Sequence, residues 1–219
     1  TIKDNYAKGG ENALTFGGAI FNDKTLIIDN SQISGNHTDT PFFAAGGAIF
    51  NSANATAEIK NSTIENNYIS TSAQNGNGGA IYNAGVLTVE NTTFKNNTDH
   101  TGELNDIYND TTGTINFDGN GTTTILSGIA GRGNITKDGN GSLNLGGKNE
   151  NFTGNFTLAK GNLNLLAGSS YFNAQNTTFD NGANFNMQNG EIDSINFGDL
   201  TLSGTSNVQA DVNLNNNTM

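Results

Sequence analysis

The chain of 219 residues contains no cysteine and no tryptophan, and proline occurs once. The absence of cysteine excludes disulfides, thiolate metal sites and thiol chemistry. Basic residues are also scarce, and the net charge of -11 argues against nucleic acid and anionic membrane surfaces as partners. No apolar run approaches the roughly 18 residues of a membrane-spanning helix. We therefore expect no direct membrane insertion by this stretch.

Asparagine and glycine dominate what is present, with about 40 and 29 residues, whereas only 33% of the chain is hydrophobic. Low hydrophobicity with a high net charge would fit a disordered chain. However, isoleucine, leucine, valine and phenylalanine recur in short runs, and asparagine or glycine bounds each run. Such order is typical of repeat proteins, in which stacked units share one continuous core.

A six-residue motif repeats along the first half of the chain. Its copies are Gly17–Asn22 (GGAIFN), Gly46–Asn51 (GGAIFN) and Gly78–Asn83 (GGAIYN), with a degenerate fourth copy at Asn105–Asn109 (NDIYN). Two further runs follow each full copy, for example Thr25–Asn30 and Gln32–Asn36 after the first. Alternation in the second run points Leu26 and Ile28 inward and Ile27 outward. One unit therefore holds three short predicted strands in about 30 residues.

Asparagine ends each predicted strand, in three columns: 22/51/83/109, 30/61/91 and 5/36/67/97. Asparagine tolerates left-handed backbone at bends, and stacked amides can bond from one unit to the next. Three strands closed by three such corners predict an all-β fold, a right-handed parallel β-helix with three-strand coils in a single solenoid. Residues 36–46 and 67–78 are expected to form polar loops that protrude at one corner.

The residues that separate the predicted strands change after about Gly128, where single glycines replace the GGA motif. Asp118–Gly121 and Asp138–Gly141 have the same sequence, DGNG, 20 residues apart, which predicts the same turn on successive coils. We expect residues 1–128 to form one β-helical region with the GGAI repeats and residues 129–219 to continue the β-helix with the second repeat type.

These motifs support a resemblance to a known class of secreted protein. The GGAI copies, paired with Ile33-x-x-Asn36, Ile64-x-x-Asn67 and Phe94-x-x-Asn97, resemble the repeats of polymorphic outer-membrane proteins. Residues 133–165 resemble the passenger-associated transport repeat of autotransporters, with Ile135 in place of its first leucine. The resemblance implies a Gram-negative passenger, secreted to the bacterial cell surface and commonly adhesive. The membrane barrel of such a protein is expected outside this stretch.

The candidate partner-binding surfaces are the loops of residues 37–46 and 68–78 or an aromatic stripe. If Ile20 points inward, then Phe21 points outward, and so do Phe50, Tyr82 and Tyr108 of the next copies. Such a stripe can bind sugars or a partner protein. Rings on adjacent coils can also simply stack on one another, which stabilises by about 0.5–1.5 kcal/mol per pair. We favour mutual stacking and keep binding as the alternative.

We predict no catalytic, cofactor-binding or metal-binding residues. Asn97–His100 (NTDH) is faintly similar to a polysaccharide-hydrolase motif, but no second aspartate pair accompanies it. His37 and His100 fall in predicted loops without cysteines, which disfavours zinc. The two DGNG segments lack the further acids of a calcium loop and are interpreted as turns.

The function expected from these features is that of an adhesin, which binds a host cell-surface protein or glycan or neighbouring bacteria through self-association. A structural spacer that assists secretion and folding, with adhesion elsewhere in the passenger, is the first alternative. A polysaccharide-acting enzyme is the second.

Overall fold

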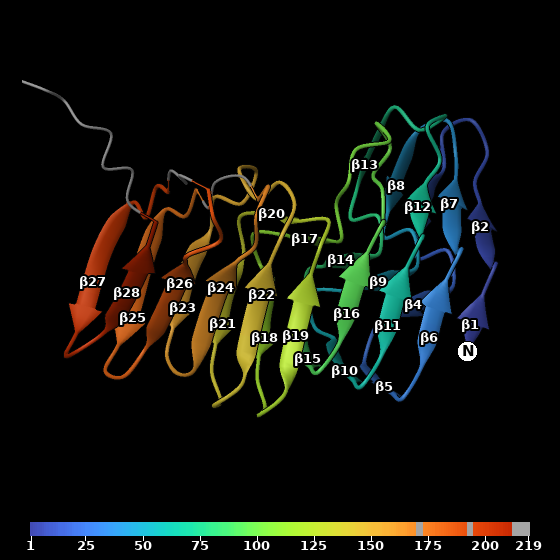
Figure 1. Cartoon of the computed structure of the whole chain (residues 1–219). Helices are drawn as coiled ribbons and strands as arrows, with labels where there is room; N and C mark the ends of the chain where they lie inside the picture. Colours follow the sequence, from blue (N-terminus) through green and yellow to red (C-terminus); the bar gives the residue numbers. More distant parts are fainter. Residues whose placement is uncertain (170–172, 192–194, 212–219) are drawn as a thin grey trace, which may run out of the picture.

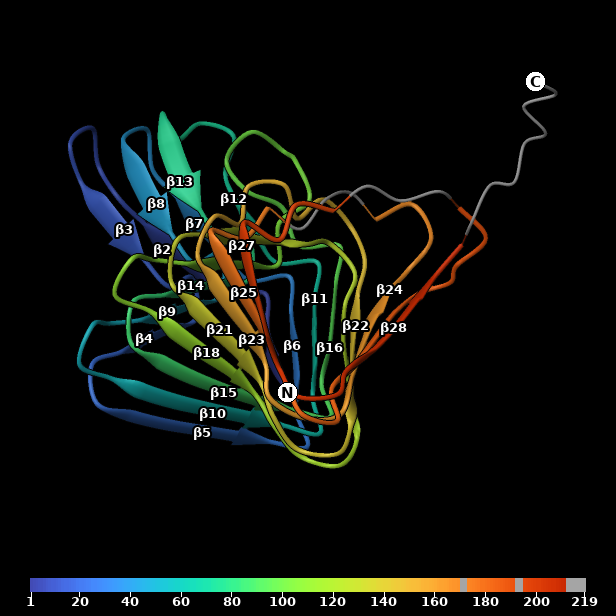
Figure 2. The ribbon, with the colours of Figure 1, turned by 90° about the vertical axis from the view of Figure 1, so that its left-hand side faces the viewer.

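The computed structural model describes residues 1–169, 173–191 and 195–211, and its regular elements in these ranges are all β-strands. Every strand pairs in parallel with the equivalent strand of a neighbouring coil. In Figure 2, the coils turn anticlockwise as they advance toward the viewer, so the solenoid is right-handed. The predicted right-handed parallel β-helix is therefore confirmed. The last predicted coil positions, residues 212–219, lie outside the described residues.

Two long sheets run the length of the molecule (Figure 1). The nine-stranded sheet contains, in order along the axis, β1 (Ile2–Lys3), β6 (Gln32–Ser34), β11 (Thr63–Glu65), β16 (Thr93–Lys95), β19 (Thr122–Ile125), β22 (Ser142–Leu145), β24 (Asn162–Leu165), β26 (Asn184–Met187) and β28 (Asn207–Ala210). The eight-stranded sheet contains β5 (Thr25–Asp29), β10 (Thr56–Lys60), β15 (Val86–Glu90), β18 (Thr114–Phe117), β21 (Asn134–Lys137), β23 (Asn155–Leu158), β25 (Asn176–Asp180) and β27 (Asp199–Ser203).

A five-stranded sheet closes the coils of the first half. It is built from the GGAI copies and their continuation, β4 (Ile20–Asn22), β9 (Ile49–Asn51), β14 (Ile81–Asn83), β17 (Ile107–Asn109) and β20 (Ile129–Gly131). The three strands predicted for each early coil are thus present. Among the described residues beyond β20, the strands of each coil belong to the two long sheets alone, so the coil narrows.

The expected polar loops of the first half are instead regular structure. Each carries two short strands, and together with an equivalent pair in residues 6–16 these form two three-stranded parallel sheets that we call the arm. One sheet contains β2 (Tyr6–Lys8), β7 (His37–Asp39) and β12 (Tyr68–Ile69), and the other β3 (Leu14–Phe16), β8 (Phe43–Ala45) and β13 (Asn75–Asn77). The arm rises above the five-stranded sheet (Figure 2), and Ala44, Ile69 and Ala73 form a small core inside it. The early coils therefore hold five strands rather than three.

The main core is a set of apolar columns that continue from coil to coil. Ile33, Ile64 and Phe94 stack in register on the nine-stranded sheet, and all three side chains are fully buried. Ile28 and Ile59 also stack in register and are buried on the eight-stranded sheet, as the alternation predicted. One cluster of buried side chains extends from Ile28 to Phe185, which makes the fold a single solenoid.

The asparagine columns close the corners in two ways. Asn30, Asn61 and Asn91 have left-handed backbone with φ of 46°, 49° and 45°. The side chains of the other two columns form buried ladders instead, in which Asn67 Nδ2 donates to Asn97 Oδ1 at 2.9 Å and Asn51 Nδ2 to Asn83 Oδ1 at 2.8 Å. The predicted amide ladders are thus present, whereas the left-handed bend is confirmed for the column 30/61/91 only.

Candidate binding surface

The aromatic stripe predicted from the GGAI copies forms a continuous column of stacked rings. Phe21, Phe50, Tyr82 and Tyr108 lie in register on β4, β9, β14 and β17, and successive ring centroids are 5.2, 5.3 and 5.2 Å apart. On β9, β14 and β17 the ring lies between a buried isoleucine and a buried asparagine, so by alternation it projects outward. Mutual stacking, the interpretation favoured above, is present. It leaves Phe21 55% exposed at the end of the column.

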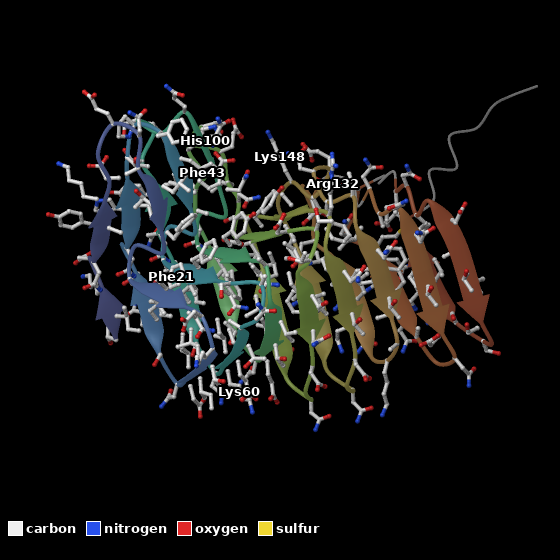
Figure 3. The ribbon with its side chains drawn as sticks, turned by 180° about the vertical axis from the view of Figure 1, so that it is seen from behind. Phe21, Phe43, Lys60, His100, Arg132 and Lys148 are labelled. Atoms are coloured by element: carbon white, nitrogen blue, oxygen red, sulfur yellow. The ribbon has the colours of Figure 1, made fainter. Side chains whose placement is uncertain are left out.

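The arm bends over this column and makes a concave corner. Phe16, at the end of β3, contacts Phe50 with ring centroids 4.6 Å apart and Phe21 at 6.2 Å, and it meets Phe43 of β8 at 6.3 Å. Figure 3 shows Phe43 on the arm above Phe21. Sequence reasoning did not anticipate Phe16 in this cluster, because it interpreted the segments of the arm as loops.

A second ring column runs along the other arm sheet. The His37 ring lies between those of Tyr6 and Tyr68, at centroid distances of 5.4 and 4.6 Å with nearly parallel planes. His37 was considered above only as a loop histidine, and the structure places it in β7 as part of this stack. The arm therefore carries its own outward aromatic column.

The main aromatic column ends at Tyr108. In the next coil the residue paired with Tyr108 is Ala130, so a methyl group occupies the column position where each earlier coil has a ring. A hollow of about 520 Å³ lies at this step, lined by Tyr108, Ala130, Asn77, Asp99, Asn105 and Arg132 together with Glu150 and Asn151. A second hollow of about 530 Å³ shares Arg132, Thr153 and Asn173 with the first and extends to Asn196. The two make one groove along the narrow coils.

Charged groups of both signs surround Tyr108. Burial raises the pKa of its hydroxyl, the negative charge of Asp110 adds to the rise, and the positive charge of Arg132 opposes it. Arg132 is thus close enough to act electrostatically on Tyr108. It is the single arginine of the chain, and it forms no salt bridge with any described residue. Figure 3 shows it on the upper side of the narrow half, near Lys148.

Asn105 contributes an unsatisfied polar group to the same place. Its side chain is 8% exposed, and its Oδ1 atom is buried without a hydrogen-bond donor among the described residues. The backbone of Asn105 is fixed, because its N–H donates to Asn97 O at 2.8 Å and its carbonyl accepts from Gly79 N at 2.9 Å. A buried amide oxygen without a partner lowers the free energy of unfolding. This one belongs to a residue that lines the hollow.

Asp106, the next residue, points inward and terminates the asparagine ladder. Asn97 Nδ2 donates to its Oδ1 at 2.6 Å, and the N–H of Ser127 donates to its Oδ2 at 2.7 Å. Burial raises the pKa of this carboxyl from its ordinary 3.8 to about 7, against the lowering effect of the hydrogen bonds from Asn97 and Ser127. Asp106 is fully buried, so its role is in the core rather than at the surface.

The other residues considered above have local partners. Asp99 Oδ1 accepts from the N–H and hydroxyl of Thr101 at 2.8 and 2.6 Å, and His100 Nδ1 lies 2.6 Å from Gly76 O. Asp118 and Asp138 each accept from the N–H of the following glycine at 2.6 Å, which is turn chemistry. In the described ranges, no group of three acidic or histidine side chains is placed to hold a metal ion.

Comparisons with family models, curated proteins and solved structures return no match to this chain. Among the described residues, no helix has the length and apolar character needed to span a membrane.

The groove itself was not predicted. The signals available in the sequence were that the fourth GGAI copy replaces Gly-Ala by Asn105-Asp106 and that a single arginine follows soon after. Neither indicates a hollow until the coil is known to narrow at this point.

Proposed function

We propose that this chain is the surface-displayed, non-catalytic binding part of an adhesin, in which a stiff β-helix presents one concave aromatic face to a partner. The observation that carries the proposal is the outward column from Phe21 to Tyr108, in which Phe21 is exposed and the other three rings are partly buried. The column lies in the corner beneath the arm and leads into a polar groove. Aromatic side chains supply large contact areas at low entropic cost, and they are enriched in protein interfaces.

The resemblance of the repeats to autotransporter passengers supports the location. We propose a Gram-negative cell surface, with a host cell-surface protein or glycan, or a passenger on a neighbouring bacterium, as partner. The net charge of -11 disfavours nucleic acid. It also opposes close packing of two copies, which favours a host partner over self-association.

Adherence of beads coated with the chain to cultured epithelial cells tests this function. We expect adherence well above that of uncoated beads, and a loss when Phe21 and Tyr82 are replaced by alanine. The matched control is Thr88→Ala, which changes an outward residue of the eight-stranded sheet and should adhere like the wild type. Bead clumping without cell adherence would favour self-association. No binding of either kind would leave the spacer as the better interpretation.

One observation favours the enzymatic alternative, namely that Asp99 and Glu150 line the same hollow. Hydrolysis of a polysaccharide needs two carboxyl groups on opposite sides of the scissile bond. The assay measures the release of reducing ends from plant, algal and bacterial polysaccharides. Release that is abolished by both Asp99→Asn and Glu150→Gln would establish an enzyme and contradict the non-catalytic proposal. We expect no release.

A further inference from the structure

We propose that the hollow beyond Tyr108 binds an uncharged oligosaccharide, with one sugar ring stacked on Tyr108 as the next ring of the aromatic column. This inference deepens the proposed binding function, on which it rests, by giving the chemical class of the ligand and the place where it binds.

The geometry of the column supports the stacking. One face of the Tyr108 ring is covered by Tyr82, with centroids 5.2 Å apart and planes inclined by 23°. In the direction of the next coil the column continues with the small side chain of Ala130. Both residues line the hollow, where Tyr108 is partly exposed and Ala130 is 7% exposed, so the Tyr108 ring is the aromatic surface available to a ligand there. The apolar C–H face of a pyranose ring suits such a surface.

The remaining walls suit hydroxyl groups rather than an apolar ligand. Asn77 and Asn151 line the hollow, and neither side-chain amide forms a hydrogen bond with a described residue. The buried Oδ1 of Asn105 also has no donor among these residues, and a ligand hydroxyl or a water bridging to it would remove that cost. Arg132 supplies donors without a competing salt bridge among the described residues. Amide, carboxylate and guanidinium groups around one ring surface match a polyhydroxylated ligand.

The size and direction of the groove favour several sugar units. A hollow of about 520 Å³ is within the ordinary range for small-ligand sites. The adjoining hollow of about 530 Å³ shares Arg132 and continues past Asn173 to Asn196. A chain that starts on Tyr108 therefore has polar side chains along its path over the next coils.

Charge selects against acidic glycans. Asp99 and Glu150 both line the first hollow, whereas Arg132 is the one cationic side chain that lines it. The whole chain carries a net charge of -11, which repels polyanions at a distance. We therefore expect neutral hexose or N-acetylhexosamine units and no tight binding of uronic acid polymers.

Binding to an immobilised panel of neutral and acidic oligosaccharides tests the proposal. The wild-type chain is expected to retain one or more neutral oligosaccharides. Tyr108→Ala removes the stacking surface and should weaken that binding at least tenfold. Ala130→Phe extends the aromatic column into the hollow and should weaken it equally. The matched control is Thr88→Ala on the outward face of the eight-stranded sheet, outside the column and the hollow, which should leave the Kd within twofold.

Thermal unfolding of each variant separates binding from folding. If Ala130→Phe is unfolded, Ala130→Leu fills the same space with a smaller side chain and carries the test. The proposal is overturned if no neutral oligosaccharide binds, if only polyanions bind, or if Tyr108→Ala binds like the wild type. Beads that adhere to cells while no oligosaccharide binds would overturn the sugar site and leave the adhesin function standing. Failure of both assays would overturn both.

Discussion

The two halves of this solenoid close the same corner with different chemistry. Between the eight-stranded and nine-stranded sheets, the wide coils turn on Asn30, Asn61 and Asn91, whose φ values lie between 45° and 49°. From the coil of β17 onward, the same corner is formed by glycine instead, at Gly119, Gly139, Gly161, Gly182 and Gly204, with φ between 76° and 102°. Asparagine reaches the first conformation at modest cost, whereas the second strongly favours glycine.

The halves differ equally in what is buried. The wide coils contain two internal amide ladders, in which each asparagine bonds both the next asparagine and a backbone carbonyl. The narrow coils rely mainly on apolar columns, for example Leu143 and Leu163. A five-strand perimeter has extra corners where strand pairing is interrupted, and the ladders satisfy backbone groups there. A two-strand coil needs fewer such devices.

The largest expected effect is the removal of one ladder rung. Asn67 donates to Ile33 O and Asn97 Oδ1, and its Oδ1 accepts from the backbone and side chain of Asn36. Asn67→Ala leaves several buried groups without partners and should lower the free energy of unfolding by about 3–5 kcal/mol. Urea unfolding measures this.

The matched control for that variant lies in the narrow half. Asn155 is also a ladder rung, bonded to Asn134 at 2.9 Å and Asn176 at 2.7 Å, but it is exposed. Asn155→Ala should cost less than about 1 kcal/mol, because water replaces the lost bonds. Equal losses for both variants would contradict the distinction drawn between the halves.

The second effect concerns pH and Asp106, where the wide half ends. The folded state raises the pKa of this carboxyl from 3.8 to about 7, so the folded chain retains a proton that the unfolded chain has released. Its contribution to stability is complete below the unfolded pKa and is lost as pH rises through 7, by about 4 kcal/mol at most.

Asp106→Asn removes this titration. Chemical unfolding between pH 4 and pH 8 should therefore show a fall in wild-type stability with rising pH that is absent from the variant. The same slope in both proteins would show that Asp106 does not titrate in this range.

A buried lysine distinguishes the narrow half. Lys137 occupies a core column between Phe117 and Leu158, and its Nζ donates to the carbonyls of Asp138, Gly139 and Lys160 at 2.6, 3.0 and 3.2 Å. Lys137→Met keeps the packing but removes these bonds, and it should cost about 2 kcal/mol. Thermal unfolding measures the loss.

Leu158→Met is the control, because it is a nearly volume-conserving change in the same column and should cost less than about 1.5 kcal/mol. A variant at Lys137 as stable as wild type would mean that the three carbonyls are satisfied by water.

The smallest effects come from exchanging the corner residues. Gly139→Asn introduces a Cβ at φ of 76° against the backbone of Gly119, so we expect a loss of about 1–2 kcal/mol. Asn61→Gly keeps an allowed backbone at φ of 49° and loses two exposed side-chain bonds, so a loss of about 0.5 kcal/mol is expected. Equilibrium unfolding compares the two, and the reverse order would contradict the comparison of corners.

The sequence predicted the solenoid because its strongest signals are local. The alternation in Thr25–Asn30 and the recurrence of Asn36, Asn67 and Asn97 each follow from one strand or one corner. The strands of the arm were not predicted, because segments such as His37–Asp39 and Asn75–Asn77 have no apolar alternation. They are strands because the neighbouring coil pairs with them, which is not visible in a single repeat.

The candidate site was predictable only in part. The outward column from Phe21 to Tyr108 follows from alternation within the GGAI copies. The hollow depends on the narrowing of the coil, which brings Asn77 of the arm near Arg132 and Asn151. The inward direction of Lys137 was not predicted, because it depends on the register of its strand with Phe117 and Leu158.

The central claim is that the chain adheres through the concave face ending at Tyr108. Its most direct test is the adherence of beads coated with the wild-type chain to epithelial cells in the presence of the soluble neutral oligosaccharide that binds best. The account predicts that saturating oligosaccharide reduces adherence to the level of Tyr108→Ala beads. Undiminished adherence at saturation would contradict it.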